Sequence, residues 1–377
     1  HLSLRRQRQM CIRDRQGAYA SLVDMNSPTF PATAIFDWYD RHGRSLPWRH
    51  RWPDLAPAYH VWLSEIMLQQ TVVATVIPYF LEFTRRWPDI CDLAAAGQDE
   101  VMAAWAGLGY YARARNLHRA AGIVCATHDG RFPDDVAGLR ELPGIGPYTA
   151  GAIAAIAFGR RVTVVDGNIE RVLARYFAIA TPLPAAKTEI GTRYDAILPA
   201  DRPSDFPQAL MDFANAVCTP RNPGCAACPV GQDCAARRAG TPEAWPVKAP
   251  RKVKPTRRGI AFVAIDSDGR AFMITRPERG LLGGMMAFPS AGWTPDDGTY
   301  DPGNPFAGAP FAADWRMATD GVGHVFTHFA LTMDGAVAVI EDVARSPGWH
   351  PVRPASLPTL MRKVWKVAHR QVVGNRT

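Results

Sequence analysis

The sequence predicts two domains, an all-α domain followed by a smaller α+β domain. From about Ala34 to Ala236, apolar residues recur with the three- and four-residue spacing of amphipathic helices. Between Arg237 and Arg258 the chain holds eight Lys or Arg, four Pro and one acidic residue, a composition typical of an extended linker. Beyond it, short apolar runs separated by turn residues are typical of strands. We therefore expect a multi-domain chain in which helices come first and an α+β unit follows.

Length and composition limit this prediction. The chain has 377 residues, of which 47% are hydrophobic and 21% charged, enough for two soluble globular domains. The longest apolar stretch, Thr149–Phe158, is too short to span a bilayer, and no apolar signal segment follows the basic N-terminus. The formal net charge of +8 favours a polyanionic partner, although a mildly basic enzyme without such a partner fits the charge equally well.

These patterns divide the chain into four segments. Residues 1–26 are expected to be unstructured or non-native, because this arginine-rich stretch has no hydrophobic period and Met25 could begin the protein. Residues 27–236 form the helical domain, residues 237–256 the basic, proline-rich linker, and residues 257–377 the second domain.

Within the domains the patterns predict individual elements. The first domain should have roughly ten helices, among them Tyr59–Leu68, Thr71–Phe83, Glu100–Leu108, Ala112–Val124 and Thr149–Phe158. The second should begin with a hairpin, in which Gly259–Ile265 and Ala271–Thr275 flank an Asp-Gly turn. A further strand is expected at Ala336–Ile340, and a loop rich in Gly and Pro at Asp296–Pro310.

The segment Leu142–Ala150 carries the pattern L-P-G-I-G between two helical stretches. Gly144 and Gly146 would let the backbone turn tightly and point N–H groups outward at a helix N-terminus, a geometry that binds phosphate without reading base sequence. This is the helix-hairpin-helix signature. On this segment alone, an ordinary glycine-rich connector between helices is the alternative.

Two acidic residues stand in apolar surroundings. Glu65 lies in the helical segment Val61–Thr71, where an acid is unfavourable unless it is paired or functional. Burial would raise its pKa, which suits a general acid, whereas an exposed helix face is the alternative. Asp166 follows an apolar run and precedes a helix that begins near Ile169. It could be a helix cap, or a carboxylate that faces an electron-poor sugar carbon.

Four cysteines follow the pattern C-x6-C-x2-C-x5-C, at Cys218, Cys225, Cys228 and Cys234. Four clustered thiolates hold a metal ion or a [4Fe–4S] cluster, with zinc as the simpler alternative. The other three, Cys11, Cys91 and Cys125, are scattered and form no disulfide framework, which favours a reducing intracellular compartment.

In order and spacing, these features resemble MutY-type adenine DNA glycosylases, which belong to the helix-hairpin-helix, [4Fe–4S] superfamily related to endonuclease III. The hairpin, Asp166–Asn168 and the cysteines carry the resemblance together with Leu46–Arg49, Trp62–Thr71 and Gly107–Leu117. The resemblance implies a helix-hairpin-helix glycosylase domain with an iron–sulfur cluster loop.

The resemblance also implies a reaction: adenine mispaired with 8-oxoguanine or guanine is flipped out of the duplex, and its N-glycosidic bond is hydrolysed in base excision repair. Glu65 would protonate adenine N7, while Asp166 would stay ionised and stabilise the oxocarbenium-like sugar. Orienting roles are implied for Tyr148 and Asn168, and an adenine pocket is implied for Trp48 and Arg49.

Tyr148 bears on the type of reaction. Endonuclease III-like enzymes have Lys at the matching position, and its amine forms a Schiff base with the sugar. A phenol cannot do this, so the resemblance implies a monofunctional glycosylase with weak or no lyase activity. An endonuclease III-like glycosylase and lyase for oxidised pyrimidines, and a non-catalytic lesion-binding iron–sulfur protein, are the rival functions.

The second domain carries a resemblance of its own. Gly280–Pro289 resembles the Nudix-like domain that MutY-type proteins append, but the acidic pattern R-E-x-x-E-E does not follow it, so no nucleotide hydrolysis is expected. The segment Phe326-Thr327-His328 aligns with the F-S-H loop of the family, with Thr in place of Ser. Contacts to 8-oxoguanine are implied for Gln69, Gln70, Thr71, Leu108, Tyr110, Phe326, Thr327 and His328.

The remaining implications concern cofactor, partners and location. The cofactor would be a [4Fe–4S] cluster on the four cysteines, and the partner would be double-stranded DNA that contains A·8-oxoguanine or A·G. A monomer is expected, in a cytoplasmic, bacterial-type and nucleoid-associated setting, with no membrane partner.

Overall fold

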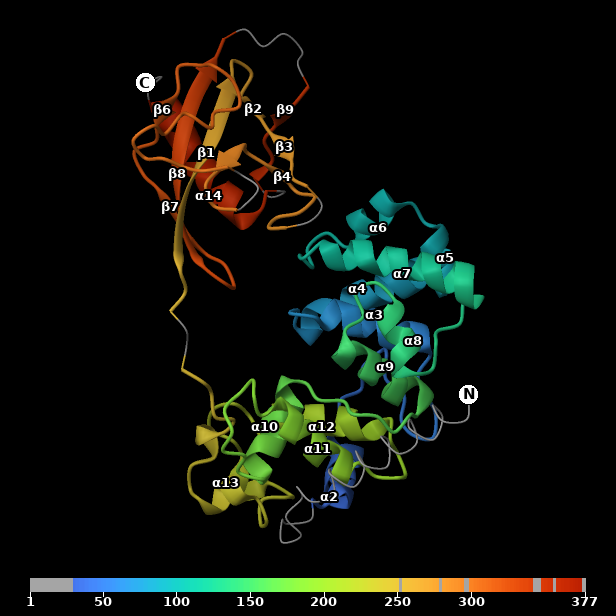
Figure 1. Cartoon of the computed structure of the whole chain (residues 1–377). Coiled ribbons are helices and arrows are strands. Elements are labelled where there is room, and N and C mark those ends of the chain that lie inside the picture. Colours follow the sequence, from blue (N-terminus) through green and yellow to red (C-terminus); the bar gives the residue numbers. More distant parts are fainter. Residues whose placement is uncertain are drawn as a thin grey trace, which may run out of the picture. The chain divides into compact units, whose positions relative to one another are not determined.

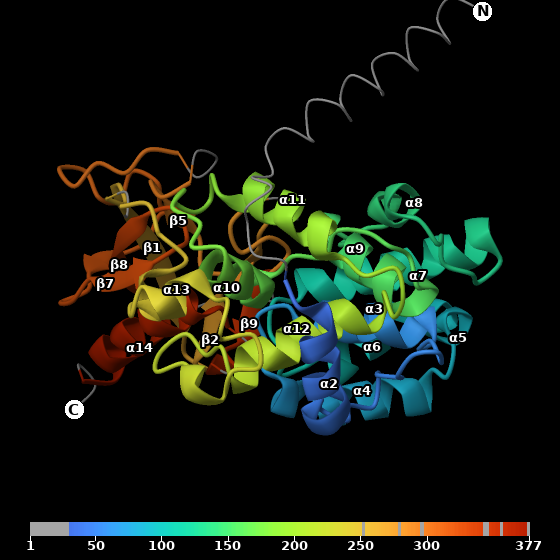
Figure 2. The same ribbon diagram turned by 90° about the horizontal axis from the view of Figure 1, so that it is seen from below.

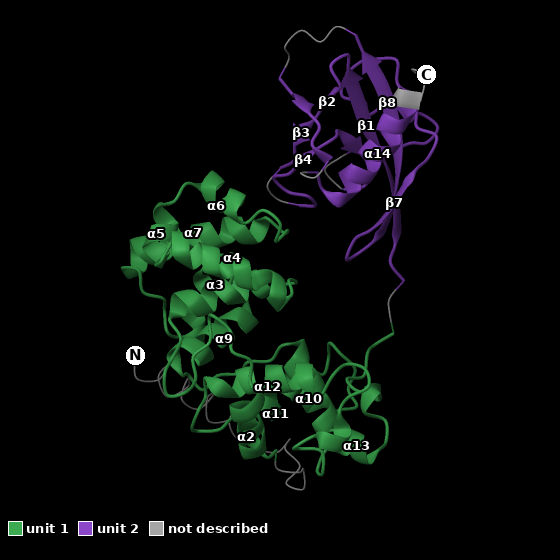
Figure 3. Cartoon of the chain, turned by 180° about the vertical axis from the view of Figure 1, so that it is seen from behind, with its two compact units in different colours: residues 1–250 green, residues 251–377 purple. Residues whose placement is uncertain are grey.

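The computed structural model describes residues 30–250, 253–277, 280–294, 298–341, 347–354 and 357–374. The chain forms two compact units, residues 1–250 and residues 251–377 (Figure 3). The N-terminal segment expected at residues 1–26 lies outside the described residues. The first unit is helical and the second is built around a sheet, which confirms the predicted fold class.

The helical unit contains two groups of helices (Figure 1): α3 to α9 form one group, and α2 joins α10 to α13 in the other. Helix α9 packs on α3 in the first group and on α12 in the second, and so joins them. In chain order the helices are α2 (Ala32–His42), α3 (Ala58–Leu68), α4 (Val73–Arg86), α5 (Ile90–Ala95), α6 (Gln98–Ala104), α7 (Ala112–His128), α8 (Val136–Glu141), α9 (Pro147–Phe158), α10 (Gly167–Tyr176), α11 (Lys187–Ile197), α12 (Asp205–Ala216) and α13 (Ala235–Arg238).

The buried helix α9 sets the geometry of this unit. Pro147 occupies its first turn, where a missing N–H costs nothing, and the helix is buried on all sides from Thr149 to Ala157. Small residues permit close packing: a Cβ at Gly151 would lie 2.7 Å from the carbonyl oxygen of Thr163. The segment that leads into α10 therefore lies directly against α9.

The hairpin before α9 uses its two glycines differently. Gly144 has φ +83°, a left-handed conformation that favours glycine, whereas Gly146 has φ −86° and precedes the first turn of α9. Both are exposed, and no atom lies within 4 Å of a Cβ built on Gly146. The N-terminus of α9 is thus open to a neighbouring molecule.

The cysteine-rich segment closes the helical unit. It comprises the short helix η1 (Cys225–Ala227), α13 and a second short helix, η2 (Pro242–Ala244). Val247 and Ala249 then pair through the backbone with Leu183. Residues 237–250, which we expected to be part of an extended linker, therefore belong to the helical unit.

The second unit is a mixed sheet with one long helix, α14 (Thr359–Gly374). Its central strands β1 (Thr256–Asp266) and β8 (Ala330–Ile340) run parallel in register from Thr256↔Ala330 to Asp266↔Ile340. The strand order is β6-β8-β1-β2-β9, and β5 and β7 pair with β1 and β8. The remaining strands are β2 (Arg270–Phe272), β3 (Ile274–Thr275), β4 (Met286–Ala287), β5 (Ser290–Ala291), β6 (Arg316–Met317), β7 (Val322–Val325) and β9 (Trp349–Pro351).

Alternate residues of β1 enter two different cores. Ala261, Val263 and Ile265 pack in the core that includes residues of α14, while Ile260 and Phe262 pack with aromatic residues of loops on the opposite face. The expected hairpin is present, because β1 and β2 pair antiparallel at Ile265↔Ala271. The expected strand at 336–340 is the second half of β8.

Within the part of the chain that the structure describes, no helix is long and apolar enough to cross a membrane.

Helices α10 and α12 lie next to each other in both views of the helical unit (Figures 1 and 2), and they pack directly.

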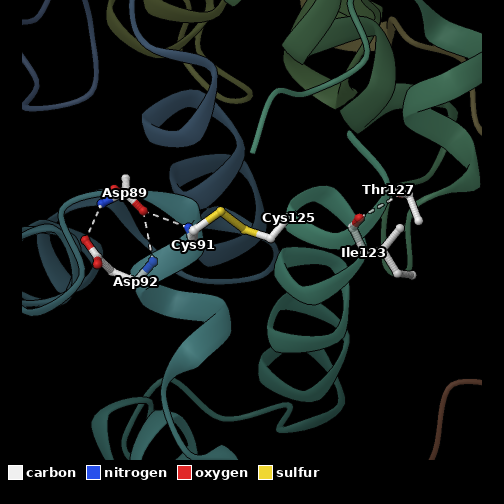
Figure 4. Close-up of a disulfide and its surroundings, with 6 residues drawn as sticks. All are labelled: Asp89, Cys91, Asp92, Ile123, Cys125 and Thr127. Atoms are coloured by element: carbon white, nitrogen blue, oxygen red, sulfur yellow. Dashed lines mark hydrogen bonds between the residues drawn. A yellow bond between two sulfur atoms is a disulfide. The ribbon is translucent and has the colours of Figure 1, made fainter. Parts of the chain in front are cut away.

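One disulfide corrects an expectation from the sequence. Cys91 at the start of α5 is bonded to Cys125 in α7 (Figure 4), with a Cα–Cα distance of 5.6 Å. These two cysteines are therefore not isolated, and Cys11 lies outside the described residues. The bond joins residues 34 positions apart in the chain, so it restricts the unfolded state and ties the two helices together.

We predict that the double variant Cys91→Ser/Cys125→Ser loses about 2–4 kcal/mol of unfolding free energy relative to the oxidised parent, because the cross-link restricts the unfolded chain. Thermal unfolding followed by circular dichroism measures this. A mild thiol reductant should lower the parent's melting temperature and leave the variant's unchanged. An equal decrease in both would contradict a role for this bond.

Candidate active site

A cavity of about 500 Å³ lies in the helical unit, among α3, α9, the N-terminus of α10 and α12. Eight of the residues singled out in the sequence line it: Trp48, Arg49, Glu65, Gln69, Thr71, Tyr148, Asp166 and Asn168. The folding of α9 against the segment before α10 is what brings the two carboxyl groups, 101 positions apart in the chain, to one cavity.

Glu65 presents its carboxyl group to this cavity from the last turn of α3. It is itself half-buried and its neighbours Ser64, Ile66 and Met67 are buried, so the alternative of an exposed helix face is wrong. The pKa of Glu65 is raised to about 7, mainly by burial and also by the charge of the nearby Asp166, while the interaction with the Tyr148 hydroxyl and the charge of Arg49 oppose the rise. Near neutral pH this carboxyl group is therefore able to hold and release a proton.

Tyr148 stands in the first turn of α9, next to both carboxyl groups. Burial and the charges of Glu65 and Asp166 raise the pKa of its phenol well above the ordinary value, so the hydroxyl keeps its proton. Its hydroxyl lies close enough to the Glu65 carboxyl group to interact with it, and it also contacts the sulfur of Met211 at 4.0 Å. A neutral donor at this place fixes the orientation of Glu65 without adding a charge.

Asp166 is the N-cap of α10, and it also lines the cavity. The two interpretations from the sequence, a helix cap and a carboxylate of the site, are therefore compatible. One oxygen accepts the backbone N–H groups of Asn168 at 3.0 Å and Ile169 at 2.8 Å. The other accepts the side-chain amide of Asn168 at 2.7 Å. Three N–H donors thus hold the carboxylate in one orientation at a helix N-terminus, where negative charge is favourable.

Helix α10 also connects this site to the cysteine-rich segment. Arg171 donates to the Asn168 side-chain oxygen at 3.2 Å and to the carbonyls of Ala214 and Cys218 at 2.9 and 2.8 Å. One turn later, Arg175 donates to the carbonyl of Thr219 at 2.7 Å and to the sulfur of Cys218 at 3.4 Å. The fold of the segment after Cys218 and the orientation of Asn168 therefore depend on one helix face.

Sequence reasoning missed a charged cluster on the α12 side of the cavity. Asp212, only 2% exposed, accepts two contacts from the Arg44 guanidinium at 2.6 and 2.8 Å and one from Arg49 at 2.7 Å. These two cations hold the pKa of Asp212 below its ordinary value despite burial. The signal was available, because Asp212 is a single acid within the apolar run Ala209–Ala214. Gln208 and Asn215, also from α12, line the cavity as well.

The four expected cysteines are free, partly buried and line one small cavity of about 30 Å³ together with apolar residues. Burial raises the pKa of the Cys218 thiol, and it raises that of Cys228 to about 11. In the described ranges, no group of three His, Cys, Asp or Glu side chains is placed to hold a single metal ion. Four thiols from one short segment around one cavity are nevertheless a donor set that suits a thiolate-bound cluster.

The residues expected at 8-oxoguanine fall into three groups. Gln69 and Thr71 line the cavity, whereas Gln70 and Tyr110 are exposed and have positive φ values, and Leu108 is buried. The others, Phe326, Thr327 and His328, belong to the second unit. There Thr327 and His328 are exposed in the turn between β7 and β8, and Phe326 stacks on Trp293.

Comparison with known proteins identifies the family. Residues 63–192 match the HhH-GPD superfamily of base excision DNA repair proteins, and residues 260–367 match the NUDIX domain. A human protein named adenine DNA glycosylase is 35% identical, over 95% of this chain and 77% of its own length. The chain belongs to the adenine DNA glycosylase family. It is therefore a DNA glycosylase of base excision repair, a hydrolase of N-glycosyl bonds.

Further relatives agree with this assignment. An adenine DNA glycosylase of Buchnera aphidicola subsp. Schizaphis graminum is 35% identical, over 68% of this chain and 73% of its own length. Among solved structures, a thermostable thymine-DNA glycosylase has a TM-score of 0.51 and 27% identity, and the match covers 55% of this chain and 95% of that one. The cavity described above lies in the helical unit that this family shares.

The raised pKa of Glu65 has a consequence for stability. Its folded pKa of about 7 exceeds the unfolded value of 4.5, so between these values the folded state binds more protons. We predict that the parent's unfolding free energy, relative to that of Glu65→Gln, falls by about 2 kcal/mol as the pH rises from 5 to 8. Urea unfolding of both proteins at the two pH values measures this. A pH-independent difference would show that Glu65 has an ordinary pKa.

Proposed function

We propose that this adenine DNA glycosylase removes adenine mispaired with 8-oxoguanine or guanine, after flipping the adenine into the cavity of the helical unit. The observation that carries the proposal is the pair of unlike carboxyl groups, Glu65 and Asp166, on that one cavity. At about 500 Å³ the cavity is within the range of sites that enclose a small ligand, as a flipped base requires.

Glu65 acts as the general acid. Loss of adenine leaves negative charge on the base, and a proton donated to adenine N7 neutralises it. A pKa of about 7 leaves a large fraction of Glu65 protonated at neutral pH, and Tyr148 orients the carboxyl group. Arg49 and Trp48 line the base pocket, with Arg49 held by Asp212.

Asp166 stabilises the positive charge that develops on the sugar. Its carboxylate is fixed by three N–H donors, so it needs little reorganisation when this charge appears. Asn168 holds one of its oxygens and is itself held by Arg171. A water molecule then completes hydrolysis at the sugar carbon, as in other two-carboxylate glycosidases.

The reaction stops at base removal. A lyase step through a Schiff base needs an amine near the sugar, and the phenol of Tyr148 stands at that place in the cavity. The raised pKa of this phenol also argues against its acting as a nucleophile. We therefore propose a monofunctional glycosylase with weak or no lyase activity.

The four cysteines hold a [4Fe–4S] cluster in this proposal. Their spacing, their shared cavity and the Arg175 donor to Cys218 support such a cluster, which would supply a rigid core for a basic loop. Zinc is the alternative metal for these four cysteines. Metal and acid-labile sulfide analysis of anaerobically purified protein should give iron and sulfide in equal amounts, and zinc without sulfide would contradict the proposal.

DNA is the partner, bound as a duplex by a monomer. The exposed glycines of the hairpin and the open N-terminus of α9 suit phosphate, and the net charge of +8 suits a polyanion. The exposed Thr327 keeps a hydroxyl for a lesion contact. We also propose a cytoplasmic location, because four free, clustered cysteines suit a reducing compartment.

Single-turnover adenine release from a duplex with one A·8-oxoguanine pair tests the proposal. The parent should release adenine faster as the pH falls through about 7, because Glu65 gains its proton, and Glu65→Gln should lose at least a hundredfold in rate. Borohydride added to the same reactions should trap almost no covalent adduct.

Three outcomes would contradict the proposal. Equal rates for parent and variant would remove Glu65 from the chemistry. Tight binding without release by the parent would leave a lesion sensor. A high yield of trapped adduct would favour the endonuclease III-like reaction.

A further inference from the structure

Arg113, the second residue of α7, makes more hydrogen bonds than the predicted roles account for. Its Nη1 donates to the carbonyls of Ile66 and Met67, each at 3.0 Å, and of Gln69 at 2.6 Å. Its Nη2 donates to the carbonyls of Leu108 at 2.9 Å and Gly109 at 3.2 Å, and to the Thr71 hydroxyl at 3.3 Å. One guanidinium group therefore holds together three pieces of chain, of which two are adjacent in sequence and the third lies about 40 positions further on.

The first of these pieces is the end of α3. The last carbonyls of a helix have no partner within the helix, and Ile66 and Met67 belong to the last turn of α3. Arg113 supplies donors to both. Because Glu65 is the residue immediately before Ile66, the same contact steadies the part of α3 that carries the proposed general acid.

The other two pieces are tight turns with unusual backbone. In the first, residues 69–71, Gln70 has φ +59°, and in the second, residues 107–110, Tyr110 has φ +49°. Neither residue is glycine, so each conformation is unfavourable by itself and has to be imposed by surrounding contacts. Arg113 contacts both turns, and its guanidinium carbon also lies 5.5 Å from the Tyr110 ring and 5.2 Å from the Trp105 ring.

The chemistry of Arg113 favours a positioning role over a role in binding DNA. Its partners are neutral oxygens, and burial lowers the pKa of the guanidinium. Arg113 is half-buried, and both terminal nitrogens of its guanidinium are already bonded to protein oxygens, so they have little reach left for a phosphate. Its planar fork serves two turns at once, which the single ammonium group of Lys cannot reproduce.

We propose that Arg113 is a positioning residue that sets the 69–71 turn and the 107–110 turn at a fixed separation, and that discrimination of the base opposite adenine depends on it. This inference rests on the proposed function and on the resemblance to MutY-type enzymes, which implies that residues of both turns contact that base. Arg113 acts through the two turns and does not touch the DNA.

The test compares the parent, Arg113→Lys, and a control, Arg119→Lys, on the exposed side of the same helix. Single-turnover adenine release is measured on duplexes with adenine opposite 8-oxoguanine and opposite guanine, with enzyme in excess. We expect Arg113→Lys to lower the ratio of the two rate constants at least tenfold, and Arg119→Lys to leave it unchanged. In such an experiment, unfolded enzyme lowers the reaction amplitude, whereas misplaced turns alter the rate constants.

The outcomes separate this inference from the function on which it rests. Parent protein that releases no adenine from either duplex sinks the proposed function itself. If the parent is active and Arg113→Lys keeps the parent's ratio, with or without a lower amplitude, the positioning role is wrong. Arg113→Gln, which retains two N–H donors, provides a second series. Complete loss of folded protein in both variants would make Arg113 a purely structural residue and would also overturn the inference.

Discussion

The withdrawal of Glu65 from water is the constraint on which this site depends. A carboxyl group within an apolar helix is unfavourable when ionised, and burial therefore raises the pKa of Glu65 to about 7, although the neighbouring Tyr148 hydroxyl opposes this rise. The buried helix α9 makes this arrangement possible, because it supplies Tyr148 and brings the N-terminus of α10 to the same cavity. Glu65 and Asp166 thus take different roles because their environments differ, although both line one cavity.

The charged groups around the cavity are held by one another rather than by solvent. Asp212 fixes Arg44 and Arg49, and its own burial is tolerable because two cations compensate it. Helix α10 performs a similar task for Asp166, since N–H groups at its N-terminus donate to the capping Asp166 carboxylate, and its later turns hold the cysteine-rich segment. The geometry of the active site and the conformation of the cysteine-rich segment therefore both depend on helix α10, so a change at one end of this helix should alter the structure at the other end.

Much of this arrangement could be predicted from the sequence, and the reasons differ by residue. The hairpin, the helical class of the first unit and the β1–β2 turn depend on local patterns of glycine and apolar residues. Glu65 and Asp166 could be singled out because acids in apolar runs are rare. Asp212 could have been singled out on the same ground, but its partners and those of Arg113 could not be predicted, because each joins segments distant in the chain and the spacing of single residues does not encode such contacts. The Cys91–Cys125 disulfide could not be predicted from the sequence for the same reason.

The most direct test of this account is the ionisation of Glu65 itself. Carbon-13 labelling of the glutamate carboxyl groups, with Glu65→Gln used to assign the resonance, would follow its titration by NMR in the DNA-free protein. The account predicts one carboxyl resonance that titrates with a midpoint near pH 7 and is absent from the variant. A midpoint in the ordinary range of exposed glutamates, about 4–5, would contradict it, since Glu65 would then be ionised at neutral pH and could not protonate adenine.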